Sequence, residues 1–287
     1  MNGATMLTPK DLYPPSFNPE KYAEKVGITK IFSIEINSLA TKVHENNPLS
    51  AVDPNNIQPF PPKIEDLGRL HWLTCDRRVT TILEFGVGYS TDVFADAISR
   101  NKKAVDALFL NGIRRGNPFE VHSIDNNQNW VDICKQRVCK SEEKASVVRL
   151  HLAKLYMSTF NGRICTFYDP LPDLSPDLIY IDGPDQNSVN GTVRGISTRH
   201  GDRMPMSGDI LAIEHFLQPG TLIVIDGRSA NARFLRSNLQ RNWSYLHIPE
   251  WDQHYFELQE PPLGRFNKML IDKTLGESYY HRLEATL

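Results

Sequence analysis

The residues whose types and spacing best suit chemistry lie at the end of the first short apolar run. Glu84 lies near the end of this run, Gly86 and Gly88 follow, and Ser90 opens the next predicted helix. Glycine permits a sharp turn and lets a ligand approach the backbone, while the unpaired N–H groups of a first helical turn attract an anion. We therefore predict that these four residues line a cofactor site. The alternative is a tight strand–helix turn that binds nothing.

A second acid, Asp125, ends the next predicted strand and is followed by two asparagines. A carboxylate at the tip of the second strand is placed to accept both hydroxyls of a ribose. Aspartate and asparagine also favour the position just before a helix, so a helix cap is the competing interpretation. The number of residues between Glu84 and Asp125 exceeds that of a minimal nucleotide-binding unit. We predict that residues 101–118 are an insertion that lengthens the connection between the first two strands.

Two more acids, Asp182 and Asp226, end later apolar runs. The carboxyl ends of parallel strands meet at one edge of a sheet, where such folds bind their ligands. Two carboxylates there could hold a divalent cation such as Mg²⁺, which would lower the pKa of a substrate hydroxyl. Alternatively, Asp182 contacts the cofactor or the substrate directly, or both acids only cap loops.

A polar loop over residues 183–206 leaves the sheet at the edge where a substrate should lie. A loop this long inside a compact domain is usually functional or disordered. Its candidate substrate-contacting residues are Asp185, Asn187, Arg194, Arg199 and His200. His200 is also a candidate general base, with a solvated histidine in a mobile loop as the alternative. Arg228 could bind an anionic substrate group or pair with Asp182 or Asp226.

The elements that must position these residues alternate between strands and helices from residue 80 onward. Continuous apolar strands between helices predict a parallel sheet covered on both faces, in an α/β, doubly wound fold. The predicted strands are Thr80–Phe85, Val121–Asp125, Val147–His151, Leu178–Asp182 and Thr221–Asp226, and the predicted helices are Thr91–Arg100, Asn129–Cys139, Ser207–Leu217 and Ala230–Leu239. We expect antiparallel C-terminal strands to complete the sheet, at Tyr245–Ile248, Tyr255–Leu258 and Lys268–Ile271.

Residues 1–79 form a proline-rich N-terminal extension in this interpretation, and residues 80–287 form the main domain. Helical spacing of apolar residues predicts helices over Ile28–His44 and Ile64–Arg77, joined by proline-stiffened connectors. The extension could cap the main domain, cover a site or mediate oligomerisation.

The motifs together resemble the class I S-adenosylmethionine-dependent methyltransferases, over about residues 80–272. The resemblance is carried by Glu84-Phe-Gly-Val-Gly-Tyr-Ser, Asp125, Asp177–Pro184 and Pro219–Asp226, and is greatest to the small-molecule O-methyltransferase branch. It implies a Rossmann-like fold in which the glycine loop, with Glu84, Gly86, Gly88 and Ser90, holds the methionine part of S-adenosylmethionine. Asp125 would hold the ribose, and Asp182 would also contact the cofactor.

The resemblance implies an enzyme that methylates a small-molecule hydroxyl, with Asp182, Asp226 and His200 as the catalytic candidates. Some related enzymes hold a cation between a strand-four Asp and an acidic pair after strand five. Here Gly227 stands where the second member of that pair would be. One alternative is a cofactor-binding protein without efficient catalysis. Another is a nicotinamide-dinucleotide oxidoreductase, which Thr91 weakens because it replaces the third glycine of G-x-G-x-x-G.

The composition excludes several other classes of protein. The 287 residues carry a formal net charge of −2, whereas a general nucleic-acid binder needs a basic face. No apolar stretch is long enough for a membrane span, and the N-terminus lacks the pattern of a secretory signal. We expect a cytoplasmic protein with a small-molecule substrate, a possible homo-oligomer, whose four cysteines are reduced and mostly buried.

Overall fold

The structure is a computed structural model that describes residues 7–32 and 62–284. Seven strands form one sheet in the order β3-β2-β1-β6-β7-β9-β8, in which β9 runs antiparallel to the other six. The strands are β1 (Thr81–Phe85), β2 (Glu120–Asp125), β3 (Val148–Leu152), β6 (Leu178–Ile181), β7 (Leu222–Asp226), β8 (Trp243–Ile248) and β9 (Gln253–Leu258). The mainly parallel sheet with antiparallel C-terminal strands confirms the predicted fold class.

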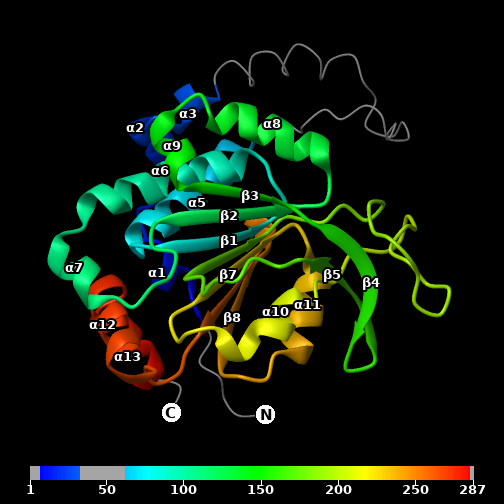
Figure 1. Ribbon diagram of the computed structural model, residues 1–287. Coiled ribbons are helices and arrows are strands. Elements are labelled where there is room, and N and C mark those ends of the chain that lie inside the picture. The colour runs from blue at the N-terminus through cyan, green and yellow to red at the C-terminus, as the bar shows by residue number, and fades with distance from the viewer. Residues whose placement is uncertain (1–6, 33–61, 285–287) are drawn as a thin grey trace.

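Helices cover both faces of the sheet (Figure 1). The described helices are α1 (Pro9–Leu12), α2 (Pro19–Val26), α3 (Ile28–Ile31), α5 (Ile64–Asp76), α6 (Tyr89–Ala104), α7 (Ala107–Gly112), α8 (Gln128–Val138), α9 (Glu142–Val147), α10 (Asp209–Ile213), α11 (Ser229–Asn238), α12 (Gly264–Thr274) and α13 (Glu277–Glu284). The predicted helices at 64–77, 91–100, 129–139 and 230–239 are confirmed. The predicted helix at 207–217 is shorter, because α10 passes into a 3₁₀ turn at Glu214–Phe216.

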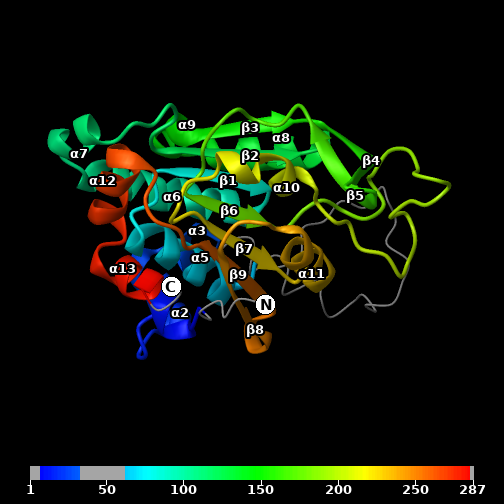
Figure 2. The same ribbon diagram turned by 90° about the horizontal axis from the view of Figure 1, so that it is seen from below.

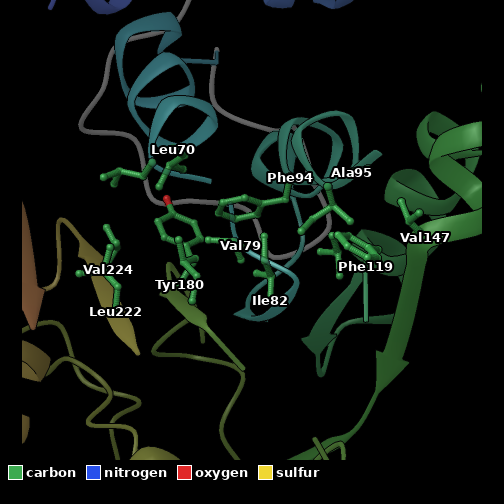
Figure 3. Packing of buried hydrophobic residues seen from close by; sticks show 14 of the residues in the cluster. Leu70, Val79, Ile82, Phe94, Ala95, Phe119, Val147, Tyr180, Leu222 and Val224 are labelled. Carbon is green, nitrogen blue, oxygen red and sulfur yellow. The ribbon is translucent and has the colours of Figure 1, made fainter. Parts of the chain in front are cut away.

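Successive residues of each central strand enter two different cores, since side chains alternate across a sheet. Ile82 of β1 packs with Leu70 of α5 and Phe94 of α6, as Figure 3 shows. Its neighbour Leu83 packs in the opposite core with Ile210 of α10. Both sides of the strand are therefore buried, which explains the continuous apolar runs in the sequence.

The predicted strand at Lys268–Ile271 is wrong, because these residues lie within helix α12. Asn267, Leu270 and Ile271 are the buried residues of α12, and their spacing of three and four places them on one face. Ile271 packs in a small cluster with Tyr279 of α13. Helix α12 lies beside α7, and α12 and α13 both stand at one end of the sheet, far from the hairpin over residues 154–169 (Figure 2).

A two-stranded antiparallel hairpin, β4 (Lys154–Phe160) and β5 (Arg163–Asp169), was not predicted. Its signal is Asn161-Gly162, the dipeptide typical of a tight hairpin turn, and both residues have positive φ. Because β4 begins just after β3 ends, the hairpin stands at the carboxyl edge of the main sheet.

The described part of the N-terminal segment packs onto the main sheet domain. Leu70 of α5 enters the same core as the sheet, while Ala23, Ile28 and Phe32 pack against Val93 of α6. Residues 33–44 of the helix predicted at 28–44 lie outside the described residues, as do residues 53–61 of the second proline run. The domain boundary at residue 79 stays a prediction.

All four cysteines are free: Cys134 and Cys165 are buried, Cys75 is half-buried and Cys139 is exposed. Within residues 7–32 and 62–284, no helix combines the length and the apolar character that crossing a membrane requires.

Candidate functional site

Two turns meet in backbone contact at the carboxyl edge of the sheet. The turn after β1 holds Gly86, with φ +95°, and the turn after β6 holds Gly183. A Cβ atom on Gly183 would lie 2.8 Å from the Gly86 nitrogen, and one on Gly86 would lie 3.1 Å from the Gly183 nitrogen. Neither turn has room for a side chain, so both glycines are required by this close approach. Sequence reasoning singled out only Gly86.

The backbone at Gly88, by contrast, is open. A Cβ atom placed there would meet only the Ser90 hydroxyl, at 3.9 Å. Helix α6 begins at the next residue, so its first unpaired N–H groups lie beside this space. A ligand can therefore approach the glycine turn and the start of α6 together.

Glu84 is fully buried and holds this region together from within. Its carboxylate accepts hydrogen bonds from the hydroxyls of Ser90 (2.5 Å), Thr91 (2.6 Å) and Ser123 (2.5 Å). Burial raises the pKa of Glu84 to about 7, and the three hydroxyl donors oppose that rise. Glu84 and Ser90, both predicted to line the site, bond to each other and fix α6 against β1 and β2.

Asp125 holds the glycine turn from the second strand. One carboxylate oxygen accepts the backbone N–H of Val87 at 3.1 Å, and the other accepts that of Asn127 at 2.8 Å. The N-cap residue of α8 is Asn127, whose side chain accepts the N–H of Asn129. Asp125 therefore does not cap this helix. A carboxylate has about four acceptor positions, so Asp125 keeps capacity for further donors.

Arg228 pairs with the turn that carries Asp182. Its guanidinium donates to the backbone carbonyls of Pro184 (2.8 Å) and Asp182 (2.5 Å), and its Nε lies 3.7 Å from the Asp182 carboxylate. The Asp182 side chain is 55% exposed. The structure therefore shows the predicted alternative in which Arg228 pairs with Asp182. Through these contacts Arg228 links the turn after β7 to the turn after β6.

Asp226 lies among polar groups from three other elements. It accepts the Tyr180 hydroxyl at 3.3 Å and the Gln253 side-chain amide at 3.2 Å. Burial and the negative charges of Asp182 and Asp66 together raise the pKa of Asp226 to about 7. Asp226 is therefore a carboxyl group that can exchange a proton near neutral pH.

Sequence reasoning missed the polar chain that leads from Asp226 to the N-terminal segment. The Gln253 amide lies 3.5 Å from Asp66 of α5, and its carbonyl accepts the Tyr255 hydroxyl at 2.5 Å. That hydroxyl in turn lies 3.1 Å from the hydroxyl of Tyr13. No short motif marks these residues, because they come together only when α5, β9 and the N-terminal segment pack on the sheet.

Tyr168 of the β4–β5 hairpin is a further residue that the sequence did not reveal. Its side chain is 4% exposed, and its hydroxyl has no hydrogen-bond partner in the described chain. Burial raises its pKa, with contributions of opposite sign from Asp125 and Arg228, which lie near it. Tyr168 therefore presents an unpaired hydroxyl close to the carboxyl edge.

The loop over 183–206 is tied to the hairpin. Asn190 exchanges backbone hydrogen bonds with Leu155 and Met157 of β4, and Ser188 bonds to Asn126, next to Asp125. Arg194, with φ +54°, stands at the tip of a tight turn between Val193 and Ile196.

The hydrogen bonds of two substrate candidates, Asp185 and His200, stay within this loop. Asp185 accepts the backbone N–H of Asn187, and the half-exposed ring of His200 accepts that of Asp202. In the described ranges, no hydrogen bond or ion pair joins Arg194, Arg199 or His200 to Asp182 or Asp226. Their predicted roles stay predictions.

A metal ion in a protein is held by several side chains whose ligand atoms converge. Three or more His, Cys, Asp or Glu side chains converge closely enough for a metal at one place, His247, Asp252 and His254. Asp182 and Asp226 lack a third such partner in the residues that the structure places. Arg228 supplies positive charge there already, and a cation site at Asp182 and Asp226 stays a prediction.

No family model and no curated protein matches this chain. Similar solved structures include the O-methyltransferase TomG from Streptomyces achromogenes in complex with S-adenosylmethionine, at 13% identity and a TM-score of 0.40, covering 84% of this chain and 98% of that one. The Podospora anserina methyltransferase PaMTH1, bound to S-adenosylhomocysteine, has 13% identity and a TM-score of 0.45, covering 86% and 99%. An O-methyltransferase from Bacillus cereus has 14% identity and a TM-score of 0.39, covering 83% and 98%. The strand order of this chain gives a doubly wound α/β sheet whose last two strands are joined in antiparallel fashion.

Proposed function

We propose that this protein is an S-adenosylmethionine-dependent methyltransferase that acts on a hydroxyl group of a small molecule. The observation that carries the proposal is the position of Asp125. It holds the glycine turn through the Val87 N–H and keeps acceptor capacity at the tip of the second strand. That is where a ribose is bound in folds of this kind.

The residues at this edge suit the cofactor in three respects. The open backbone at Gly88 and the first N–H groups of α6 can receive a carboxylate. Asp125 can accept ribose hydroxyls. The unpaired Tyr168 hydroxyl can hydrogen-bond to a polar group of a bound molecule. When bound, S-adenosylmethionine supplies a methyl group that its sulfonium already activates.

The protein then has to orient the acceptor hydroxyl and receive its proton. Asp226 suits the second task, because its pKa of about 7 matches a general base near neutral pH. Asp182 is half-exposed beside it, and Arg228 holds the turn of Asp182 in place. Asp185, Arg194 and Arg199 are proposed to contact the substrate from the outer loop. Because the cation ligand set is incomplete, we derive no step through Mg²⁺.

The experiment is a calorimetric titration of the full chain with S-adenosylhomocysteine and, separately, with NAD. Saturable binding of S-adenosylhomocysteine alone is expected. In Gly88→Val this binding should fall by about tenfold or more, which corresponds to about 1.4 kcal/mol, because the branched side chain occupies the space beside the turn, where its Cβ comes no closer to protein than 3.9 Å. The matched control is Gly116→Val, whose Cβ meets nothing within 4 Å.

Binding of NAD but not of S-adenosylhomocysteine would overturn the proposal in favour of an oxidoreductase. Methyl transfer from labelled S-adenosylmethionine to a small-molecule extract is the activity test, run with and without a chelator. Binding without transfer would show a cofactor-binding protein instead. Transfer that the chelator abolishes would show that the reaction needs a divalent cation.

A further inference from the structure

The hairpin formed by β8 and β9 brings together three side chains of the types that bind transition metals. His247 and His254 are directly opposite each other in the antiparallel pairing, and Asp252 lies in the turn between the strands. Ligand atoms of all three lie within 4.8 Å of one another. We propose that His247, Asp252 and His254 bind a divalent transition-metal ion of the zinc class.

The cross-strand position of the histidines suits chelation. Their rings stack, with centroids 3.9 Å apart and planes 10° apart. His247 and Asp252 are exposed, so an ion can enter from solvent, and His254 is buried beneath them. Among the placed residues, no hydrogen bond holds the ring of His247, which can therefore turn so that its lone pair converges with that of His254.

The buried ligand has the outer partners that metal-bound histidines usually have. One ring nitrogen of His254 lies 2.8 Å from the Tyr245 hydroxyl, and the other lies 2.9 Å from the Ser229 hydroxyl. Whichever nitrogen binds the ion, the other keeps a hydroxyl partner that fixes the ring and its tautomer. The hydroxyl on the binding side must move aside.

The charges around the hairpin favour a transition metal over Mg²⁺ or Ca²⁺. Arg236 lies over the ring of Tyr245, at 4.5 Å, and Arg233 acts on His254 from the same helix. These two positive charges offset the charge of the Asp252 carboxylate, so the hairpin attracts a cation only weakly by charge alone. Two imidazoles with one carboxylate are also poor ligands for the hard cations Mg²⁺ and Ca²⁺. The same set suits Zn²⁺, Ni²⁺ or Cu²⁺, which gain from bonds to nitrogen.

The proposed metal site lies next to the candidate cofactor site at the carboxyl edge of the sheet and shares none of its residues. The carbonyl of Asp252 accepts the N–H of Gly227 at 2.8 Å, and a Cβ on Gly227 would meet the Asp252 carboxylate at 3.4 Å. An ion held by Asp252 would therefore stiffen the turn that follows Asp226. The metal proposal does not depend on methyl transfer.

The test is titration of the untagged full chain with Zn²⁺, and with Co²⁺ as a coloured probe. Saturable binding of one ion per chain is expected, with visible Co²⁺ absorption bands and a raised Tm on Zn²⁺ addition. His247→Ala and Asp252→Asn should each weaken Zn²⁺ binding by about tenfold or more. Both residues are exposed, so these variants should fold.

The matched control is His281→Ala, which removes another exposed histidine, on α13. Its Zn²⁺ affinity should equal that of the wild type. Absence of saturable Zn²⁺ binding, or equal affinity in the wild type, His247→Ala and Asp252→Asn, would overturn the proposal. Neither result bears on S-adenosylhomocysteine binding, so the two proposals can fail separately.

Discussion

Three largely buried carboxyl groups have pKa values well above those of free aspartate and glutamate side chains. Burial raises the pKa of Glu84 and Asp226 to about 7 and that of Asp209 to about 6. Hydroxyl donors oppose the rise at Glu84, whereas the charges of Asp182 and Asp66 reinforce it at Asp226. An acid with a raised pKa binds its proton more tightly in the folded state than in the unfolded state.

Stability should therefore fall as pH rises from about 4 to about 7, the interval between the unfolded and folded pKa values of Asp226. In Asp226→Asn, which mimics the protonated acid, this fall should be smaller, and the variant should gain roughly 1–3 kcal/mol over the wild type at pH 8. Urea unfolding at several pH values measures the difference. An unchanged pH profile in Asp226→Asn would contradict the raised pKa.

At the scale of elements, the site depends on how the turn after β1 meets the turn after β6. The N–H of Gly86 donates to Ile124 of β2, and the N–H of Asp182 donates to Phe85. These bonds continue the strand pairing past the strand ends and bring Gly86 and Gly183 into contact. The separation of the turns is therefore set by backbone atoms, which leave little room for adjustment.

Gly183→Ala should destabilise the protein by about 1–3 kcal/mol, the usual cost of overpacking. The added methyl group would lie 2.8 Å from the Gly86 nitrogen and 2.9 Å from its Cα. Chemical denaturation gives the free energy of unfolding, and Gly116→Ala is the control because a Cβ there meets nothing within 4 Å. Equal stability of the two variants would show that the turns can separate at no cost.

At the scale of the whole molecule, the N-terminal segment is built into the core and reaches the candidate site. Phe32 is fully buried and packs edge-on against Tyr89, the first residue of α6, with ring centroids 5.1 Å apart. Tyr13 reaches the opposite end of the polar chain that leads to Asp226. The packing of this segment therefore contributes to the positions of both the glycine turn and Asp226.

Phe32→Ala should cost about 3–5 kcal/mol of stability and should also weaken S-adenosylhomocysteine binding, because Tyr89 opens the helix next to Gly88. Ile98→Ala is the matched control, since Ile98 is as fully buried as Phe32 and lies in the second half of α6, away from Gly88. We expect Ile98→Ala to lose stability and keep its affinity. If the two variants bind equally well, the N-terminal segment only stabilises the fold.

Much of the sheet could be predicted from the sequence, because short-range patterns define it. The parallel strands β1, β6 and β7 are apolar runs, and each ends at a glycine turn or an acid. The turn at Gly86 and the acids Asp125, Asp182 and Asp226 could therefore be assigned to one edge. The strand predicted at Lys268–Ile271 is wrong because a short apolar run is compatible with both a strand and a buried helical segment.

The partners of those residues were decided by the tertiary structure alone. Asp66 meets Gln253 because α5 packs beside β9, a contact that no local pattern encodes. Burial then sets the chemistry, since the same carboxyl group has a pKa of about 7 at Asp226 and an ordinary one in water. The sequence by itself determined which residues stand at the edge of the sheet. Long-range packing decided which of them touch, because the free energy of burying a charge depends on neighbours far away along the chain.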